Sequence, residues 1–139
     1  MLAALIFIPL ALSVMGGATP VADNNATAST LEKRATQFGQ ATWFNVGLGA
    51  CGEMDVNSDL VVALTPAFFG PGFPGPRCNQ GVTIRNTQNG QVAHGVVRDK
   101  CPGCAASGLD LSPALFLQLT PSLDTGVIPI AWFFDNDGP

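Results

Sequence analysis

Two carboxylates and two cysteines lie close together in the segment 96–116, VVRDKCPGCAASGLDLSPALF. Asp99 and Asp110 could serve as an acid and a base, because a glycosidase needs one protonated and one ionised carboxyl group at a defined separation. Cys101 and Cys104 have the C-x-x-C spacing of a metal knuckle or of a redox site. The segment could also be a disulfide-closed loop without chemistry of its own.

The cysteine pattern favours disulfides over a metal or redox centre. Cys51 and Cys78 stand far apart in the sequence, whereas a structural zinc site usually has a second close pair. A thioredoxin-like site needs a βαβ unit, and the sequence predicts none. An even number of cysteines in a small secreted chain is typical of two disulfides. We therefore expect no metal and no cofactor, and four cysteines leave three pairings open.

The N-terminal segment is expected to lie outside the folded domain. Residues 1–18 form an apolar run that is too short to span a bilayer and ends in small residues, which predicts a signal peptide. Residues 19–34 are polar and aperiodic, and they end in the dibasic pair Lys33-Arg34, which predicts a pro-segment or disordered linker. A buried helix and a chance pair of charges are the alternatives. The domain would then be 35–139, in a secreted protein.

The charge of the chain argues against two kinds of partner. Ten acidic and six basic residues give a formal net charge of −4, and the basic residues form no cluster. A weakly acidic chain of this kind is a poor binder of nucleic acid. The part after residue 34 also lacks a polybasic or amphipathic membrane signal. We expect a monomer in its mature form, with neither a nucleic-acid nor a membrane partner.

Short strands and one small helix are expected to position these residues. Asn89-Gly90 lies between two strand-like runs and predicts a hairpin. Ser112 followed by Pro113 predicts the N-cap of a helix over 112–120. Pro129 indicates an edge or a bulge in the last strand. The strand-like runs cover residues 37–44, 60–65, 81–86, 91–99 and 126–134. Together they predict a small β-barrel.

A series of motifs in this order resembles the double-psi β-barrel family. The motifs are GQATWF, GACG, a Cys before a strand, VVRDKCPGC, LDLSPALF and IAWFF, and they cover nearly all of 37–134. The family includes expansins, barwin, kiwellin-like proteins, family 45 endoglucanases and the rare-lipoprotein-A domain. This chain looks most like its small secreted fungal members. The resemblance implies a mainly β fold, a six-stranded double-psi β-barrel with one or two short helices.

The resemblance also implies a shallow ligand groove. Its counterparts in this chain are Thr42 on the first strand, Asp99 at the end of a strand, and Asp110 of the DLS motif. An exposed Trp43 or Trp132 would stack on a sugar ring, although either could pack in the core instead. The two carboxylates have structural alternatives as well, since Asp110 could cap the following helix and Asp99 could hold a loop. No catalytic residue is assigned.

A disulfide pairing is also implied by the resemblance. Expansins and barwin join the GACG cysteine to the one before the next strand, which gives Cys51–Cys78 and leaves Cys101–Cys104 as a tight local bridge. The pairing Cys51–Cys104 with Cys78–Cys101 stays open.

The function expected from the resemblance is non-hydrolytic binding of cell-wall polysaccharide, such as glucan, cellulose or chitin, in the manner of expansins. The alternative is a protein-binding module, a protease inhibitor or a secreted effector, with the Pro/Gly loop 70–76 as its contact element. Some small fungal members carry the label riboflavin-aldehyde-forming enzyme, but the sequence has no flavin motif. We therefore do not expect an enzyme.

Overall fold

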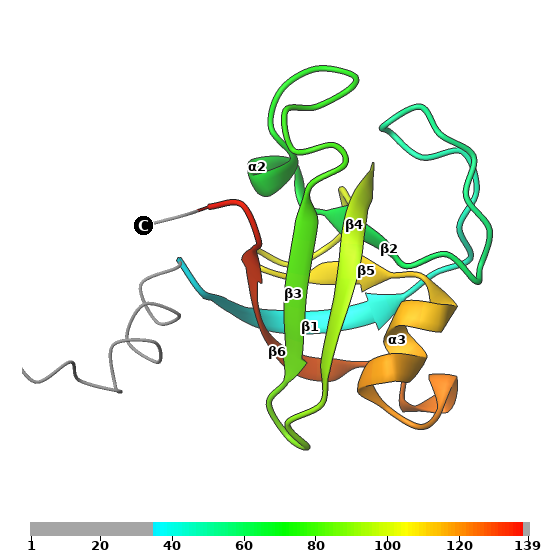
Figure 1. Ribbon diagram of the computed structural model, residues 1–139, viewed down its shortest axis with the longest axis vertical. Coiled ribbons are helices and arrows are strands. Elements are labelled where there is room, and N and C mark those ends of the chain that lie inside the picture. The colour runs from blue at the N-terminus through cyan, green and yellow to red at the C-terminus, as the bar shows by residue number, and fades with distance from the viewer. Residues whose placement is uncertain (1–34, 138–139) are drawn as a thin grey trace, which may run out of the picture.

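The computed structural model describes residues 35–137 of the chain (Figure 1). The predicted signal peptide and pro-segment lie outside the described residues. Six strands close into a barrel in the spatial order β1-β5-β2-β4-β3-β6. They are β1 (Gln37–Trp43), β2 (Val61–Leu64), β3 (Gly81–Asn86), β4 (Val92–Lys100), β5 (Leu109–Leu111) and β6 (Ile128–Phe134). The pairs β1–β5 and β2–β4 are parallel and the others are antiparallel. The mainly β barrel with two short helices is confirmed.

The helices are α2 (Pro66–Phe69) and α3 (Pro113–Leu119), with a 3₁₀ turn η1 (Leu123–Thr125) after α3. Ser112 caps α3 as predicted, because its hydroxyl accepts a hydrogen bond from the backbone N–H of Leu115. The same hydroxyl donates to the carbonyl of Asp59 at 2.6 Å, so the cap also holds the loop before β2. No helix within residues 35–137 is long and apolar enough to cross a membrane.

The barrel interior is filled by alternate side chains of the strands. Along β6, Ile130, Trp132 and Phe134 point inward, as period-two alternation requires. Trp132 is fully buried, packs edge-on against Phe68 and Phe134, and donates its indole N–H to the carbonyl of Ser107 at 2.9 Å. Trp132 therefore belongs to the core and not to the expected groove, because the strand turns it inward.

Two disulfides account for all four cysteines. Cys51 is joined to Cys78, and Cys101 is joined to Cys104. This is the pairing that the family resemblance implied. The first bridge connects the long loop between β1 and β2 to the segment that leads into β3, and the second closes a short turn after β4.

Candidate functional site

Strand register brings the predicted groove residues into one row across the barrel wall. Thr42 on β1 lies opposite Asp110 on β5, Asp110 lies opposite Ala63 on β2, and Ala63 lies opposite Asp99 on β4. The backbones at Asp110 and Asp99 are thus two strand spacings apart, roughly 10 Å. Although Thr42 and Asp110 are 68 residues apart in the sequence, the Thr42 hydroxyl donates a hydrogen bond to Asp110 Oδ1 at 2.9 Å.

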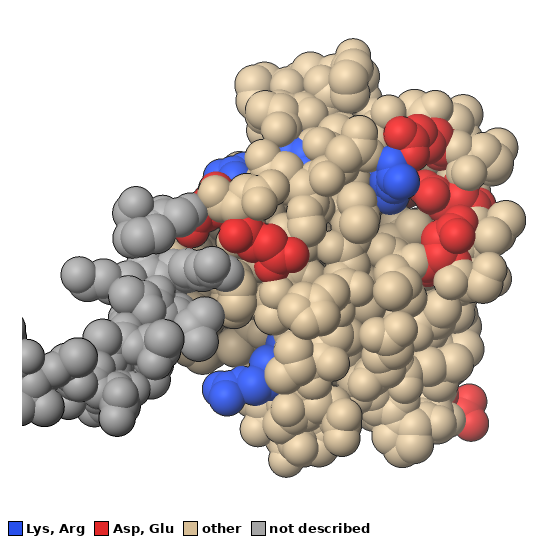
Figure 2. Space-filling view, viewed as in Figure 1, with Lys and Arg blue, Asp and Glu red and all other residues tan. Residues whose placement is uncertain are grey.

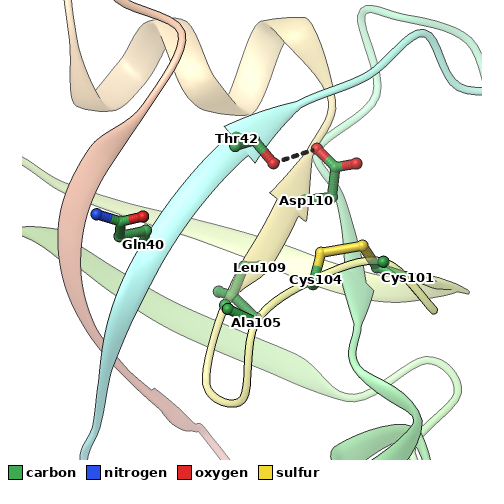
Figure 3. Close-up of a pocket in the computed structure, with 9 residues that line it drawn as sticks. Gln40, Thr42, Cys101, Cys104, Ala105, Leu109 and Asp110 are labelled. Carbon is green, nitrogen blue, oxygen red and sulfur yellow. Dashed lines mark hydrogen bonds between the residues drawn. A yellow bond between two sulfur atoms is a disulfide. The ribbon is translucent and has the colours of Figure 1, made fainter.

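Thr42 and Asp110 line an open pocket of about 320 Å³ (Figure 3). Leu109 and Leu111 point into the core, so alternation turns Asp110 outward. Gln40 precedes Thr42 by two residues on β1 and therefore shares its outer face. The Cys101–Cys104 disulfide forms part of the wall. The complete lining is Gln40, Thr42, Cys101, Gly103, Cys104, Ala105, Gly108, Leu109 and Asp110.

The carboxyl group of Asp110 holds its proton more strongly than an ordinary aspartate. Partial burial raises its pKa, and the negative charge of Asp99 adds a smaller effect in the same direction. The hydrogen bonds from the Thr42 hydroxyl and the Leu111 backbone N–H act in the opposite direction and lower the pKa. In its protonated form Asp110 could donate a hydrogen bond to a ligand, and in its ionised form it could accept one.

Asp99 has a structural role instead of a place in this pocket. Its Oδ1 accepts hydrogen bonds from the backbone N–H groups of Ala50 at 2.9 Å and Lys100 at 2.8 Å. These contacts attach the loop after β1 to the end of β4, and the carboxylate is absent from the pocket lining. The loop-holding alternative for Asp99 therefore describes the observed contacts.

Trp43 also lies away from the pocket. It shares the inner face of β1 with the buried Ala41 and packs against the core. Its indole N–H donates to the carbonyl of Leu123 at 2.9 Å. With Trp132 in the core as well, no aromatic side chain among residues 35–137 lines the pocket beside Asp110. The exposed aromatic on the outer face of β1 is Phe38, in line with Gln40 and Thr42, and period-two alternation from Thr42 could have found it.

One cluster among the described residues brings possible metal-ligand atoms together. The two sulfur atoms of Cys101 and Cys104 and a carboxylate oxygen of Asp110 lie within 4.8 Å of one another. Both sulfurs are bonded to each other, so neither is the thiolate that binds a metal. The cluster therefore does not fit a metal site while the disulfide is intact.

Comparisons with known proteins place the fold and the family. The chain is 40% identical over 101 residues to a papain inhibitor of Streptomyces mobaraensis, which covers 69% of each protein. It is 36% identical over 83 residues to an allergen homologue of Arthroderma benhamiae, covering 58% of this chain but only 28% of that protein. No family model matches the chain.

Solved structures give the same picture. The Streptomyces papain inhibitor superposes with a TM-score of 0.64 at 36% identity, over 71% of this chain and 93% of that one. An expansin of Clavibacter michiganensis, solved in complex with cellohexaose, has a TM-score of 0.63 at 22% identity, over 75% of this chain and 52% of that one.

These likenesses, with the closed six-stranded barrel, define a double-psi β-barrel protein. Within that class, the chain belongs to the family of the papain inhibitor.

Proposed function

We propose that this protein is a secreted inhibitor of papain-like cysteine proteases. The observation that carries the proposal is the 40% identity to the papain inhibitor, which extends over 101 residues and 69% of each protein. The sequence identity to the expansin is 22%, which supports a shared fold but not a shared function. The protease-inhibitor reading, which the sequence offered as an alternative, is thus better supported than polysaccharide binding.

The geometry of the pocket supports the same choice. A sugar-binding groove gains much of its affinity from an aromatic ring stacked on the sugar, and both tryptophans of this chain face inward instead. The exposed part of the molecule includes a loop of glycine, proline and phenylalanine after α2, which suits contact with another protein.

Secretion is part of the proposal. The apolar N-terminal run is typical of a signal peptide, and cleavage after Arg34 would release a domain that begins at Ala35. The two disulfides suit an oxidising extracellular environment, because such bonds persist there and are rare in the cytosol.

The test is a titration of papain activity against the purified protein, with trypsin as the control protease. We expect inhibition of papain with a Ki below about 1 μM, as a specific complex requires, and no inhibition of trypsin. The D110N variant is expected to inhibit like the wild type, because its pocket is not the proposed contact. A wild-type protein that leaves papain fully active at tens of micromolar would refute the proposal.

Polysaccharide binding is the second candidate, and the Thr42–Asp110 pair favours it. The pair lies in an open pocket and offers hydrogen-bonding oxygens to sugar hydroxyls, with Gln40 beside it and Phe38 further along the same strand face. A pull-down on cellulose, chitin, β-1,3-glucan and peptidoglycan tests this candidate. Retention on one polymer that is lost in D110N and in F38A would support it, whereas equal retention of all variants would refute this site.

A further inference from the structure

The loop between α2 and β3 presents one large apolar side chain to solvent. In the segment 70–76, GPGFPGP, the Phe73 side chain is 73% exposed, and its neighbours Pro71, Gly72 and Pro74 are exposed as well. Figure 1 shows the loop standing above the barrel beyond α2, and Figure 2 shows that end of the visible face without charged side chains. An aromatic side chain in this position is typical of the anchor of a protein interface.

The backbone of the loop is held close to one conformation. Three prolines fix their own φ angles. At Gly70, which has a φ of 85°, an added Cβ would lie 2.6 Å from Cγ of Pro76, so the two ends of the loop touch. Gly75 is buried, and a Cβ there would collide with Phe69 of α2. Because little conformational freedom remains, the loop would lose little entropy when a partner binds.

The Phe73 ring lies close to a buried aromatic ring and to a lysine of the barrel. The centroid of the Phe73 ring lies 6.4 Å from that of Phe69, which is fully buried. The ammonium group of Lys100, at the end of β4, lies 5.3 Å from the Phe73 centroid and 5.7 Å from the Phe69 centroid. These contacts hold the Phe73 ring beside α2, tilted against Phe69, while most of its surface stays exposed.

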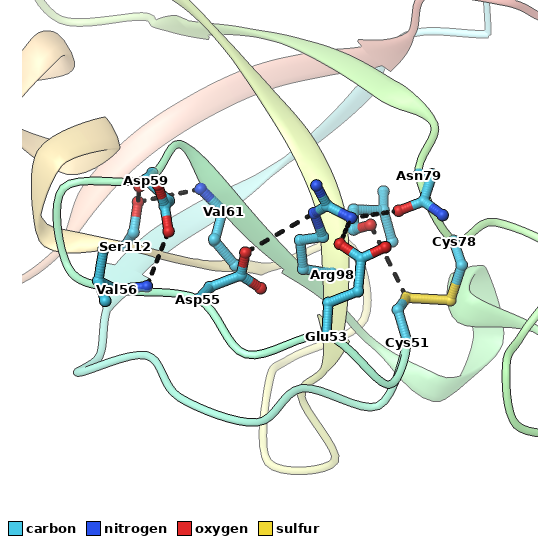
Figure 4. Close-up of polar contacts among 11 residues, drawn as sticks. Cys51, Glu53, Asp55, Val56, Asp59, Val61, Cys78, Asn79, Arg98 and Ser112 are labelled. Atoms are coloured by element: carbon cyan, nitrogen blue, oxygen red, sulfur yellow. Dashed lines mark hydrogen bonds and ion pairs between the residues drawn. A yellow bond between two sulfur atoms is a disulfide. The ribbon is translucent and has the colours of Figure 1, made fainter.

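The base of the loop is joined to the loop that follows β1. The Cys51–Cys78 disulfide links the two segments, and Arg98 of β4 lies between them (Figure 4). The Arg98 guanidinium donates to Asn79 Oδ1 at 2.6 Å on one side and pairs with Glu53 on the other. The segment that carries Phe73 is therefore fixed both covalently and by charge-assisted hydrogen bonds.

We propose that residues 70–76 enter the substrate cleft of a papain-like protease, with Phe73 filling an apolar pocket of that cleft. The inference rests on the proposed function. A substrate cleft is concave and binds peptide backbone together with apolar side chains. The loop is convex and carries no charge that would lose its hydration on entry.

The same features explain how the loop would resist cleavage. The peptide bond after Phe73 ends on the nitrogen of Pro74, which bears no hydrogen. The loop is also fixed at both ends, by α2 on one side and by the Cys78 disulfide on the other. The two ends of a cut loop would therefore stay at high effective concentration in the cleft instead of leaving it.

The experiment compares the papain Ki of the wild-type protein with those of F73A and F38A. Phe38 is the matched control, because it is the same residue type, is 70% exposed and lies on β1 outside the loop. We expect F73A to raise the Ki about 30-fold or more, as loss of an anchor side chain does, while F38A stays within about threefold. F73L is expected to recover most of the lost inhibition, because it restores a large apolar side chain.

Two negative outcomes can be told apart. If the wild type does not inhibit papain, the proposed function fails and this inference fails with it. If the wild type inhibits papain but F73A inhibits equally well, only the loop inference is overturned. Hydrogen exchange of the wild-type complex gives a readout that needs no variant. Slower exchange of the amides of Gly72, Phe73 and Gly75 in the presence of papain supports the inference, and unchanged exchange there overturns it.

Discussion

Removing each disulfide separately should reveal very different contributions to stability. Cys51–Cys78 closes a separation of 27 residues, and Cys101–Cys104 closes one of 3. A crosslink stabilises mainly by restricting the unfolded chain, and the effect grows with the logarithm of the closed loop. The expected loss is about 3.5 kcal/mol for C51A/C78A and about 1.6 kcal/mol for C101A/C104A.

Packing should widen this difference instead of narrowing it. Cys51 and Cys78 are partly buried against the hydrophobic core, whereas Cys101 and Cys104 line an open pocket. Replacing the first pair therefore also removes apolar contacts. We expect the two double variants to differ by about 2 kcal/mol or more in free energy of unfolding.

Urea unfolding under non-reducing conditions measures both values. Tryptophan fluorescence is a suitable probe, because Trp43 and Trp132 lie on the adjacent strands β1 and β6 and both pack against the core of the barrel. The free energies are extrapolated to zero urea for the wild type and the two double variants. Equal losses, or a larger loss for C101A/C104A, would refute the argument from loop closure.

Three further changes have defined expected outcomes. G95A should destabilise the barrel by about 1–3 kcal/mol, because its Cβ would collide with side chains of α3 and β2. G47A is the control and should leave the stability unchanged, because nothing lies near its Cβ. The midpoints of urea unfolding measure both effects. R98A should lower the free energy of unfolding by about 1 kcal/mol and speed hydrogen exchange in the loops 45–60 and 76–80, which Arg98 joins. Unchanged exchange in these loops would show that Arg98 does not hold them together. Because the pKa of Asp110 is raised in the folded protein, the wild type should lose stability relative to D110N as the pH rises above 3.8, until the pH passes the folded pKa. Unfolding experiments from pH 3 to 7 test the sign, and the opposite slope would show that the fold favours the ionised form.

Most of the strands could be predicted from local sequence patterns. β3 has the predicted bounds, and α3 begins after the predicted cap Ser112. The predicted hairpin between β3 and β4 forms, and Gly90 has a φ of 77°, but the connection covers residues 87–91 and Asn89 lacks the positive φ of a two-residue Asn-Gly turn. The strand β5 was not predicted as a separate strand, because three residues are too few to show a period. Its pairing with β1 and β2 depends on contacts distant in sequence.

Orientation was harder to predict than the strands themselves. Alternation requires Trp132 and Phe133 to point to opposite faces, but it does not say which one faces the core. In the closed barrel the larger ring of Trp132 fills the interior, so Phe133 faces outward.

The position of Pro129 also differs from the prediction. The proline indicated an edge or a bulge, yet β6 has neighbouring strands on both sides. The carbonyl of Pro129 accepts a hydrogen bond from the backbone N–H of Thr87, which follows the end of β3. The side of Pro129 that lacks an N–H therefore faces residues just after β3, and no hydrogen bond between β6 and β3 is lost there.

The pairing of β1 also has a consequence for how the chain is made. Both neighbours of β1 come from late in the sequence: Thr42 pairs with Asp110, and Gln37 pairs with Trp132. The barrel cannot close until residue 134 at the end of β6 is available, so β1 has no strand partner while the first hundred residues emerge from the ribosome. With this topology the stable barrel can form only after the last strand, β6, has been synthesised.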